Sequence, residues 1–176
     1  SVLNSTHLTS KVASVGLYSP LKLSGKLSKF NCFRPSKYFM CWGWATTREI
    51  WSKYELDISS RDLMVELENS KTWNSLSVRA RATWTGRFKK IQDNPFHTWD
   101  IQFQYMVFKY DFFNLLPIGA LIDNEGFDDL RSSHTKESKP RWMIQHPLPN
   151  SIIEKVSNNR LVSSLVEFVE SLTIIG

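Results

Sequence analysis

Apolar residues along this chain fall partly in short runs and partly at helical spacing, which predicts a mixture of strands and helices. Residues 11–18 (KVASVGLY) combine β-branched and small side chains and end at a Ser-Pro pair, which predicts a buried strand. A second apolar run covers residues 38–42 and ends at Gly43. Residues 20–36, which contain prolines, a glycine and basic side chains, are predicted to form a loop with short extended pieces.

Four segments in the middle of the chain carry apolar residues three or four positions apart, as amphipathic helices do. The predicted helices cover residues 45–54, a stretch that begins at a capping Ser60, residues 73–92, and residues 97–110 with Thr98 as cap. Apolar side chains in the last helix cover more than one face, so we expect it to be largely buried. The outer face of the third helix carries basic side chains: Arg79, Arg81, Arg87, Lys89 and Lys90.

The last third of the chain is less regular. Short extended pieces are predicted over residues 115–117 and 119–122, and a polar loop over residues 123–140. A final amphipathic helix is predicted over residues 158–172. The order of elements indicates an α/β protein with an α+β appearance, in which several helices pack on a few short strands.

Composition restricts the classes of protein to consider. The chain has 176 residues, of which 41% are hydrophobic and 22% charged, so one domain with a buried core is expected. Aromatic residues make up 13%, which requires large buried rings, exposed ring platforms, or both. The net charge of +5 comes from scattered rather than clustered lysines and arginines, which argues against a dedicated nucleic-acid binder.

Cysteine usage and hydropathy bear on location. Cys32 and Cys41 are the two cysteines, which allows one disulfide, but free thiols in a reducing compartment are favoured. No apolar run reaches the length of a membrane span, and residues 1–10 do not read as a secretory leader. We therefore predict a cytoplasmic protein without a transmembrane segment, and peripheral contact with a membrane stays open.

Two aromatic segments are candidates for chemistry. Trp42, Gly43 and Trp44 place two broad rings on either side of a flexible residue, where they can bind a sugar ring or fill the core. Trp99 and Asp100 lie at the start of a predicted helix, where free backbone N–H groups and the helix dipole favour a carboxylate. A carboxylate held there can act as a general base, although acidic residues at helix starts are also common structural features.

A third candidate is an acidic loop. Residues 123–135 contain four acidic residues and His134, an assortment that can hold a divalent cation or form a solvated loop. The four histidines show neither metal-ligand pairing nor a Ser-His-Asp order, and there is no glycine-rich phosphate loop. Hydrolase readings therefore have little support.

Taken in order, these segments resemble the C-terminal half of inverting glycosyltransferases with the GT-A fold, in the family-2-like group. That group carries a W-G-W-A-T-W segment, a later W-D-x-Q segment and a closing loop that ends in H-T. The corresponding segments here are Trp42–Thr46, Trp99–Gln102 and Asn124–Thr135. The resemblance covers roughly residues 10–140.

The resemblance implies roles for particular residues. It implies that Asp100 is the catalytic base, which deprotonates an acceptor hydroxyl for attack on the anomeric carbon of a nucleotide sugar. It implies that His134 approaches a divalent cation, Mn or Mg, at the donor diphosphate. The substrate-binding residues that it implies are Trp42, Gly43, Trp44, Trp99, Gln102 and Asp129.

The resemblance also implies an organisation and a set of partners. Residues 1–149 would form the acceptor-side half of a GT-A domain, and residues 150–176 a helical tail. The partners would be a nucleotide-sugar donor and a glycan or glycolipid acceptor. Thr47 stands where the group has its third Trp, and no two aspartates lie two positions apart, so the metal-binding D-x-D motif is absent.

The absent motif leaves two readings open. In the first, the chain is part of an enzyme that binds its cation only together with an N-terminal half, by self-association or by pairing with that half. In the second, it is a non-catalytic module that binds carbohydrate or protein through the same aromatic surface.

Overall fold

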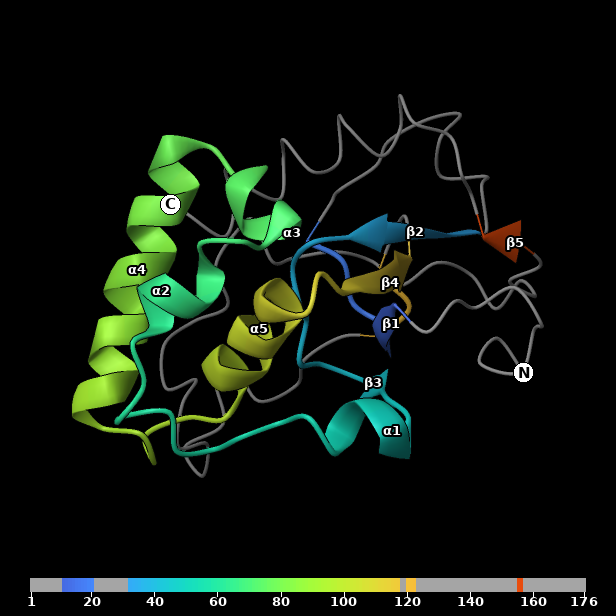
Figure 1. Cartoon of the computed structure of the whole chain (residues 1–176). Helices are drawn as coiled ribbons and strands as arrows, with labels where there is room; N and C mark the ends of the chain where they lie inside the picture. Colours follow the sequence, from blue (N-terminus) through green and yellow to red (C-terminus); the bar gives the residue numbers. More distant parts are fainter. Residues whose placement is uncertain (1–10, 21–31, 118–119, 123–154, 157–176) are drawn as a thin grey trace, which may run out of the picture.

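The computed structural model describes residues 11–20, 32–117, 120–122 and 155–156, which form a mixed α/β structure (Figure 1). The described strands form a five-stranded sheet in the order β3-β1-β4-β2-β5. Strand β1 runs parallel to β4, and β2 runs parallel to β5. The β1–β3 and β2–β4 pairs are antiparallel. The strands are β1 (Val12–Gly16), β2 (Cys32–Ser36), β3 (Trp44–Ala45), β4 (Phe113–Pro117) and β5 (Lys155–Val156).

The strand predictions are partly confirmed. Strand β1 lies within the predicted 11–18 segment, and β4 includes the extended residues 115–117. The prediction for residues 20–36 was a loop with short extended pieces, and the end of this segment forms one such piece, β2, which pairs with β4. Residues 38–42 form no strand, since the chain there leaves β2 and crosses to β3.

The helices are shorter than predicted, and at all but the last of them a polar side chain caps the start. They are α1 (Arg48–Trp51), α2 (Leu63–Leu67), α3 (Lys71–Asn74), α4 (Val78–Asp93) and α5 (Asp100–Lys109). Thr47 accepts a hydrogen bond from the Ile50 N–H, so α1 starts later than the predicted 45–54 helix. Asp62, rather than the predicted Ser60, caps α2 by accepting from the Val65 N–H.

The predicted 73–92 helix is two helices. Ser70 caps α3, and Ser77 has an extended backbone and accepts a hydrogen bond from the Ala80 N–H. A serine hydroxyl gives the free N–H groups of a new helix a partner, so the chain breaks and restarts at Ser77. The aromatic side chains of α3 and α4 still reach one core, which is why the periodicity runs through the break.

Helix α5 lies between α4 and the sheet (Figure 1). Tyr105 and Phe108 pack with the α4 side chains Trp84 and Phe88 in one hydrophobic cluster. A second cluster joins other α5 residues to Ala13 of β1: Phe103, Met106 and Val107. The prediction that this helix is largely buried is confirmed, because its residues 102–108 are all buried.

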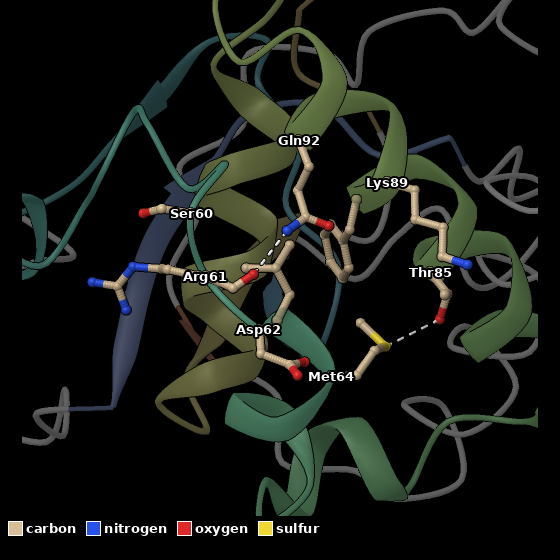
Figure 2. Close-up of a pocket in the computed structure, with 9 residues that line it drawn as sticks. Ser60, Arg61, Asp62, Met64, Thr85, Lys89 and Gln92 are labelled. Carbon is tan, nitrogen blue, oxygen red and sulfur yellow. Dashed lines mark hydrogen bonds between the residues drawn. The ribbon is translucent and has the colours of Figure 1, made fainter.

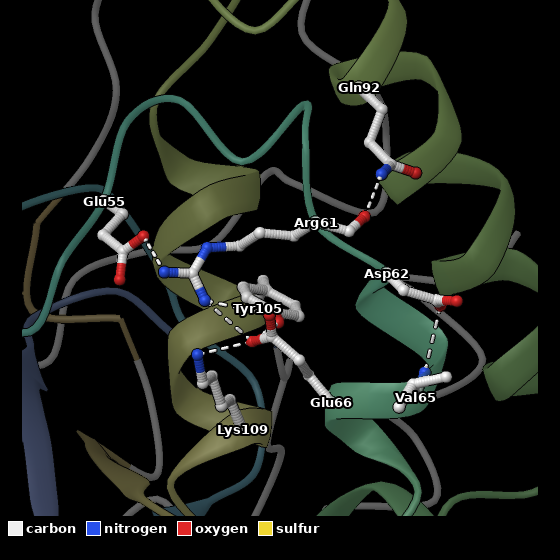
Figure 3. Close-up of polar contacts among 8 residues, drawn as sticks. All are labelled: Glu55, Arg61, Asp62, Val65, Glu66, Gln92, Tyr105 and Lys109. Atoms are coloured by element: carbon white, nitrogen blue, oxygen red, sulfur yellow. Dashed lines mark hydrogen bonds and ion pairs between the residues drawn. The ribbon is translucent and has the colours of Figure 1, made fainter.

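An ion-pair network fixes the segment before α2 to α5 (Figure 3). The Arg61 guanidinium pairs with Glu55 and lies 2.9 Å from the Glu66 carboxylate. Glu66 also accepts a hydrogen bond from the Tyr105 hydroxyl at 2.7 Å and pairs with Lys109. Burial opposes ionisation of Glu66, but its bonds from Lys109, Tyr105 and Arg61 together lower its pKa to about 2.

The end of α5 is joined to the start of α3. Asp111, whose backbone φ is +55°, accepts hydrogen bonds from the Thr72 N–H and the Ser70 hydroxyl. The same Ser70 hydroxyl lies 2.6 Å from the Phe108 carbonyl oxygen. Burial opposes ionisation of Asp111, but these donors lower its pKa below the usual value.

Within the described ranges, no helix has both the length and the apolar character that crossing a bilayer requires. Of residues 150–176, the structure describes only strand β5. The predicted helix over residues 158–172 lies outside the described residues, as do the whole predicted loop over 123–140 and residues 118–119.

We expect Glu66→Gln to destabilise the chain by about 1–2 kcal/mol at pH 7. The pKa of Glu66 is lower in the folded chain than its ordinary 4.5, so its contribution is complete above about pH 5 and is lost as the pH falls toward 2. Chemical denaturation at several pH values measures this, and the variant should show a shallower loss of stability below pH 5. Glu68→Gln, at an exposed position on the same segment, is the control and should leave the pH dependence unchanged.

Candidate functional site

Asp100 is the first residue of α5 and is half-buried. Its carboxylate accepts a hydrogen bond from the Thr98 hydroxyl. Thr98 was predicted to cap the helix, and this is wrong: Trp99 occupies the N-cap position and makes no side-chain capping bond. The first-turn carboxylate therefore sits beside the free backbone N–H groups at the start of the helix.

Three side chains from other parts of the chain lie within the electrostatic range of Asp100. Burial raises the pKa of the Cys41 thiol to about 11, and the Asp100 charge adds to that increase. Burial and the same charge raise the pKa of Tyr54 to about 12. Burial lowers the pKa of Arg87, while the Asp100 charge opposes the decrease. The Asp100 charge thus acts on side chains from three other segments of the chain.

Arg87 differs from its sequence-based description. It was placed on the outer face of a helix with other basic residues, but it is half-buried and its guanidinium lies 4.7 Å from the centre of the Trp84 ring. A guanidinium over a tryptophan face gains a cation–π attraction, which accounts for its inward position. Arg87 is therefore a basic residue of α4 whose charge interacts with that of Asp100.

Six aromatic side chains gather next to Asp100, and we call them the aromatic cluster: Phe39, Trp44, Trp51, Tyr54, Trp99 and Phe103. Trp44 stacks on Trp99 with ring centres 5.2 Å apart and an interplanar angle of 23°. Trp51 stacks on Tyr54 at 4.6 Å, and its ring centre lies 6.1 Å from that of Trp44. The segments that contain Trp44 and Trp99 are far apart in the sequence, so the fold brings together two residues that the resemblance placed in one site.

The two tryptophans of the W-G-W segment pack against different aromatic residues. Trp42 packs edge-on against Tyr18 at 4.7 Å, while Trp44 joins the aromatic cluster. Gly43 lies between them with φ at +54°, and its carbonyl oxygen accepts a hydrogen bond from the Leu17 N–H at 2.7 Å. A positive φ suits glycine, so this turn sends the two rings to different neighbours.

Gln102 is buried in the core side of α5. Its amide donates to the carbonyl oxygens of Pro95, at 2.7 Å, and Leu56, at 3.2 Å. With 1% of its surface exposed, it contacts two backbone segments rather than the solvent-facing part of the site. Gln102 therefore holds in place the segment that leads into Asp100.

Asp129 and His134, the other predicted site residues, lie outside the described residues. Among the residues that the structure does describe, no group of three or more His, Cys, Asp or Glu side chains is arranged to hold a metal ion. The divalent cation therefore stays a prediction. Cys41 is a free thiol, as predicted.

Sequence reasoning did not assign Cys41, Trp51, Tyr54 or Arg87 to the site. Trp51 and Tyr54 are three positions apart on one side of the predicted 45–54 helix, and this spacing was the available signal. Nothing in the local sequence distinguishes Arg87 from the neighbouring basic residues, because its burial depends on contacts made in the folded chain.

A separate groove of about 460 Å³ runs between the start of α2 and the middle of α4 (Figure 2). Gln92 donates to the Arg61 carbonyl oxygen across it at 2.8 Å, and the buried Phe88 ring lies at its base. Its lining residues include none of the aromatic cluster: Ser60, Arg61, Asp62, Leu63, Met64, Thr85, Phe88, Lys89 and Gln92.

Comparison of this chain with protein-family models, with curated proteins and with solved structures finds no match. What the site can do is therefore argued from its own geometry. A half-buried carboxylate, a guanidinium and stacked tryptophans suit a ligand with hydroxyl groups and apolar ring faces.

We expect Gly43→Ala to cost about 2–4 kcal/mol of stability. A Cβ there would lie 2.4 Å from the Ile122 Cδ1 atom, in a backbone conformation with positive φ. Gly86→Ala is the matched control, because nothing lies within 4 Å of its added Cβ and it is inside α4. The control should stabilise the chain by about 0.5–1 kcal/mol, as alanine does in a helix. Thermal and denaturant unfolding measure both, and equal effects would contradict the strained turn.

We expect the Cys41 thiol to react slowly with iodoacetamide at pH 8, because its pKa of about 11 leaves little thiolate. In a Cys32→Ser background, Asp100→Asn should lower the pKa of Cys41 and speed alkylation at pH 8 several-fold. Asp93→Asn, at an exposed position on α4, should have no such effect. If Asp100→Asn leaves the alkylation rate of Cys41 unchanged, the carboxylate and the thiol are not neighbours.

Proposed function

We propose that this chain is the acceptor-side part of an inverting glycosyltransferase with a GT-A fold, with Asp100 as its general base. The observation that carries the proposal is the position of Asp100. Its half-buried carboxylate lies at the N-terminal end of α5. The preceding residue, Trp99, stacks on Trp44 of the W-G-W segment. Two of the segments that carry the resemblance thus lie together, next to a carboxylate that can act as a general base.

The proposed step transfers one proton and one glycosyl group. The Asp100 carboxylate accepts the proton of an acceptor hydroxyl, and the oxygen attacks the anomeric carbon of the donor. A new carbon–oxygen bond forms on one face of the sugar while the bond to the nucleoside diphosphate breaks on the other. The configuration at that carbon is inverted, and the diphosphate leaves with the electron pair of the broken bond.

The surroundings of Asp100 support this role in two ways. The Thr98 hydroxyl and the first turn of α5 hold the carboxylate in place and leave it with further acceptor capacity. Gln102, fixed to the Pro95 carbonyl oxygen, acts as a positioning residue for the segment that carries Trp99 and Asp100. The divalent cation and the groups that bind the donor diphosphate would lie in the predicted N-terminal half and among residues outside the described ranges.

A non-catalytic carbohydrate-binding module is the second candidate. It is favoured by the exposure of Trp51 and Trp99, which are 44% and 36% exposed although both are large aromatic residues. This reading needs the tryptophans but not the Asp100 charge. The two candidates therefore differ in their response to a change at Asp100.

We expect Asp100→Asn to abolish glycosyl transfer by the full-length product of the gene that encodes this chain, with a loss of at least about a hundredfold, since general bases contribute 10²–10⁴-fold. Release of nucleoside diphosphate from a panel of nucleotide sugars measures it. Asp93→Asn is the control and should retain full activity. If the Asp100→Asn variant still transfers sugar, Asp100 is not the general base. If the wild-type protein itself transfers no sugar, the binding module is favoured.

A further inference from the structure

Two tryptophans of the aromatic cluster reach the surface on either side of a third. Trp51 is 44% exposed and Trp99 is 36% exposed, while Trp44 between them is half-buried. The Trp44 ring centre lies 6.1 Å from that of Trp51 and 5.2 Å from that of Trp99. The three rings thus form a row that leads from α1 to the start of α5, where Asp100 lies.

Neighbouring side chains hold the rings of this row in place. Trp51 stacks on Tyr54 and packs 6.2 Å from the fully buried Phe103 ring. The Tyr54 hydroxyl donates to the Trp99 carbonyl oxygen at 3.3 Å. Because both exposed tryptophans are braced by other groups, a ligand that stacks on them needs to order few side chains.

The size of the exposed aromatic surface favours a small ligand over a protein. A tryptophan side chain offers at most about 250 Å², so the two exposed fractions amount to roughly 200 Å². A stable protein interface needs about 800 Å² on each partner. The other side chains of α1 near this row include the exposed and charged Arg48 and Glu49, which do not extend the apolar surface.

The chemistry beside the row favours an uncharged ligand rich in hydroxyl groups. The negative face of an aromatic ring attracts the weakly positive C–H hydrogens of a sugar ring. The Asp100 carboxylate, next to Trp99, accepts hydrogen bonds from hydroxyl groups and repels a phosphate placed against it. A neutral sugar therefore meets no opposing charge from Asp100, and its ring faces suit the tryptophans.

We propose that Trp51 and Trp99 form a binding platform for a neutral oligosaccharide, with one sugar ring at Trp99 beside Asp100 and a further ring at Trp51. Trp51 then determines which acceptors bind, because it contacts a sugar that does not itself react. That the ring at Trp99 carries the reacting hydroxyl rests on the proposed function, but the platform does not. Trp51 is in none of the segments that the resemblance assigned.

The test is the binding of neutral tetrasaccharides to the whole chain, measured by titration calorimetry. The probes are tetrasaccharides of glucose, N-acetylglucosamine, galactose and mannose. We expect at least one to bind and Trp51→Ala to weaken it about tenfold, the effect of losing one stacked ring. Trp51→Phe should restore part of the affinity. Phe96→Ala is the matched control, because it removes a 72% exposed ring outside the row.

The outcomes separate this inference from the proposed function. If no probe binds the wild-type chain, or if Trp51→Ala binds as tightly as the wild type, the platform is overturned. Circular dichroism on each variant shows whether it is folded, and Trp51→Phe provides the comparison if the alanine variant is not. If Asp100→Asn keeps tetrasaccharide binding and the full-length product transfers no sugar, the platform stands and the proposed function fails.

Discussion

Helix α5 is buried along both of its flanks, and the positions of the other described elements depend on this packing. On one flank Phe108 meets the aromatic side chains of α4, and on the other Phe103 and Val107 meet β1 and its neighbours. Each buried aromatic or aliphatic side chain of this size contributes about 1.5–3 kcal/mol. A helix held on two sides cannot shift without losing both sets of contacts. The packing of the core therefore fixes the position of Asp100 at the N-terminal end of α5.

This arrangement also explains which parts of the fold could be predicted from the sequence. The burial of α5 could be predicted because apolar residues cover more than one of its faces, and β1 because its residues are uniformly apolar or small. Strand β2 could not, since it contains Pro35 and the fully buried Arg34, which read as loop residues. The break before α4 could not be predicted, because the helical backbone is interrupted at Ser77 while the spacing of the apolar side chains continues through it.

The candidate site divides in a similar way. Trp44, Trp99 and Asp100 were singled out from local sequence, and the fold places the segments that contain them side by side. Trp42 was grouped with Trp44 because the two are adjacent in sequence, yet the backbone at Gly43 separates their neighbours. The titratable groups on which the Asp100 charge acts, Cys41, Tyr54 and Arg87, come from three distant segments, and such neighbours depend on tertiary contacts that no short pattern contains.

The buried amide of Gln102 has a consequence for how the site behaves over time. It joins the carbonyl oxygens of Leu56 and Pro95, so the chain after α1 and the chain before α5 are tied to one rigid helix. Movement of either segment would leave a buried polar group without its partner, which costs about 1–3 kcal/mol. The proposed platform of Trp51 and Trp99 is therefore preorganised, and association of a sugar with it should need no slow rearrangement of the chain.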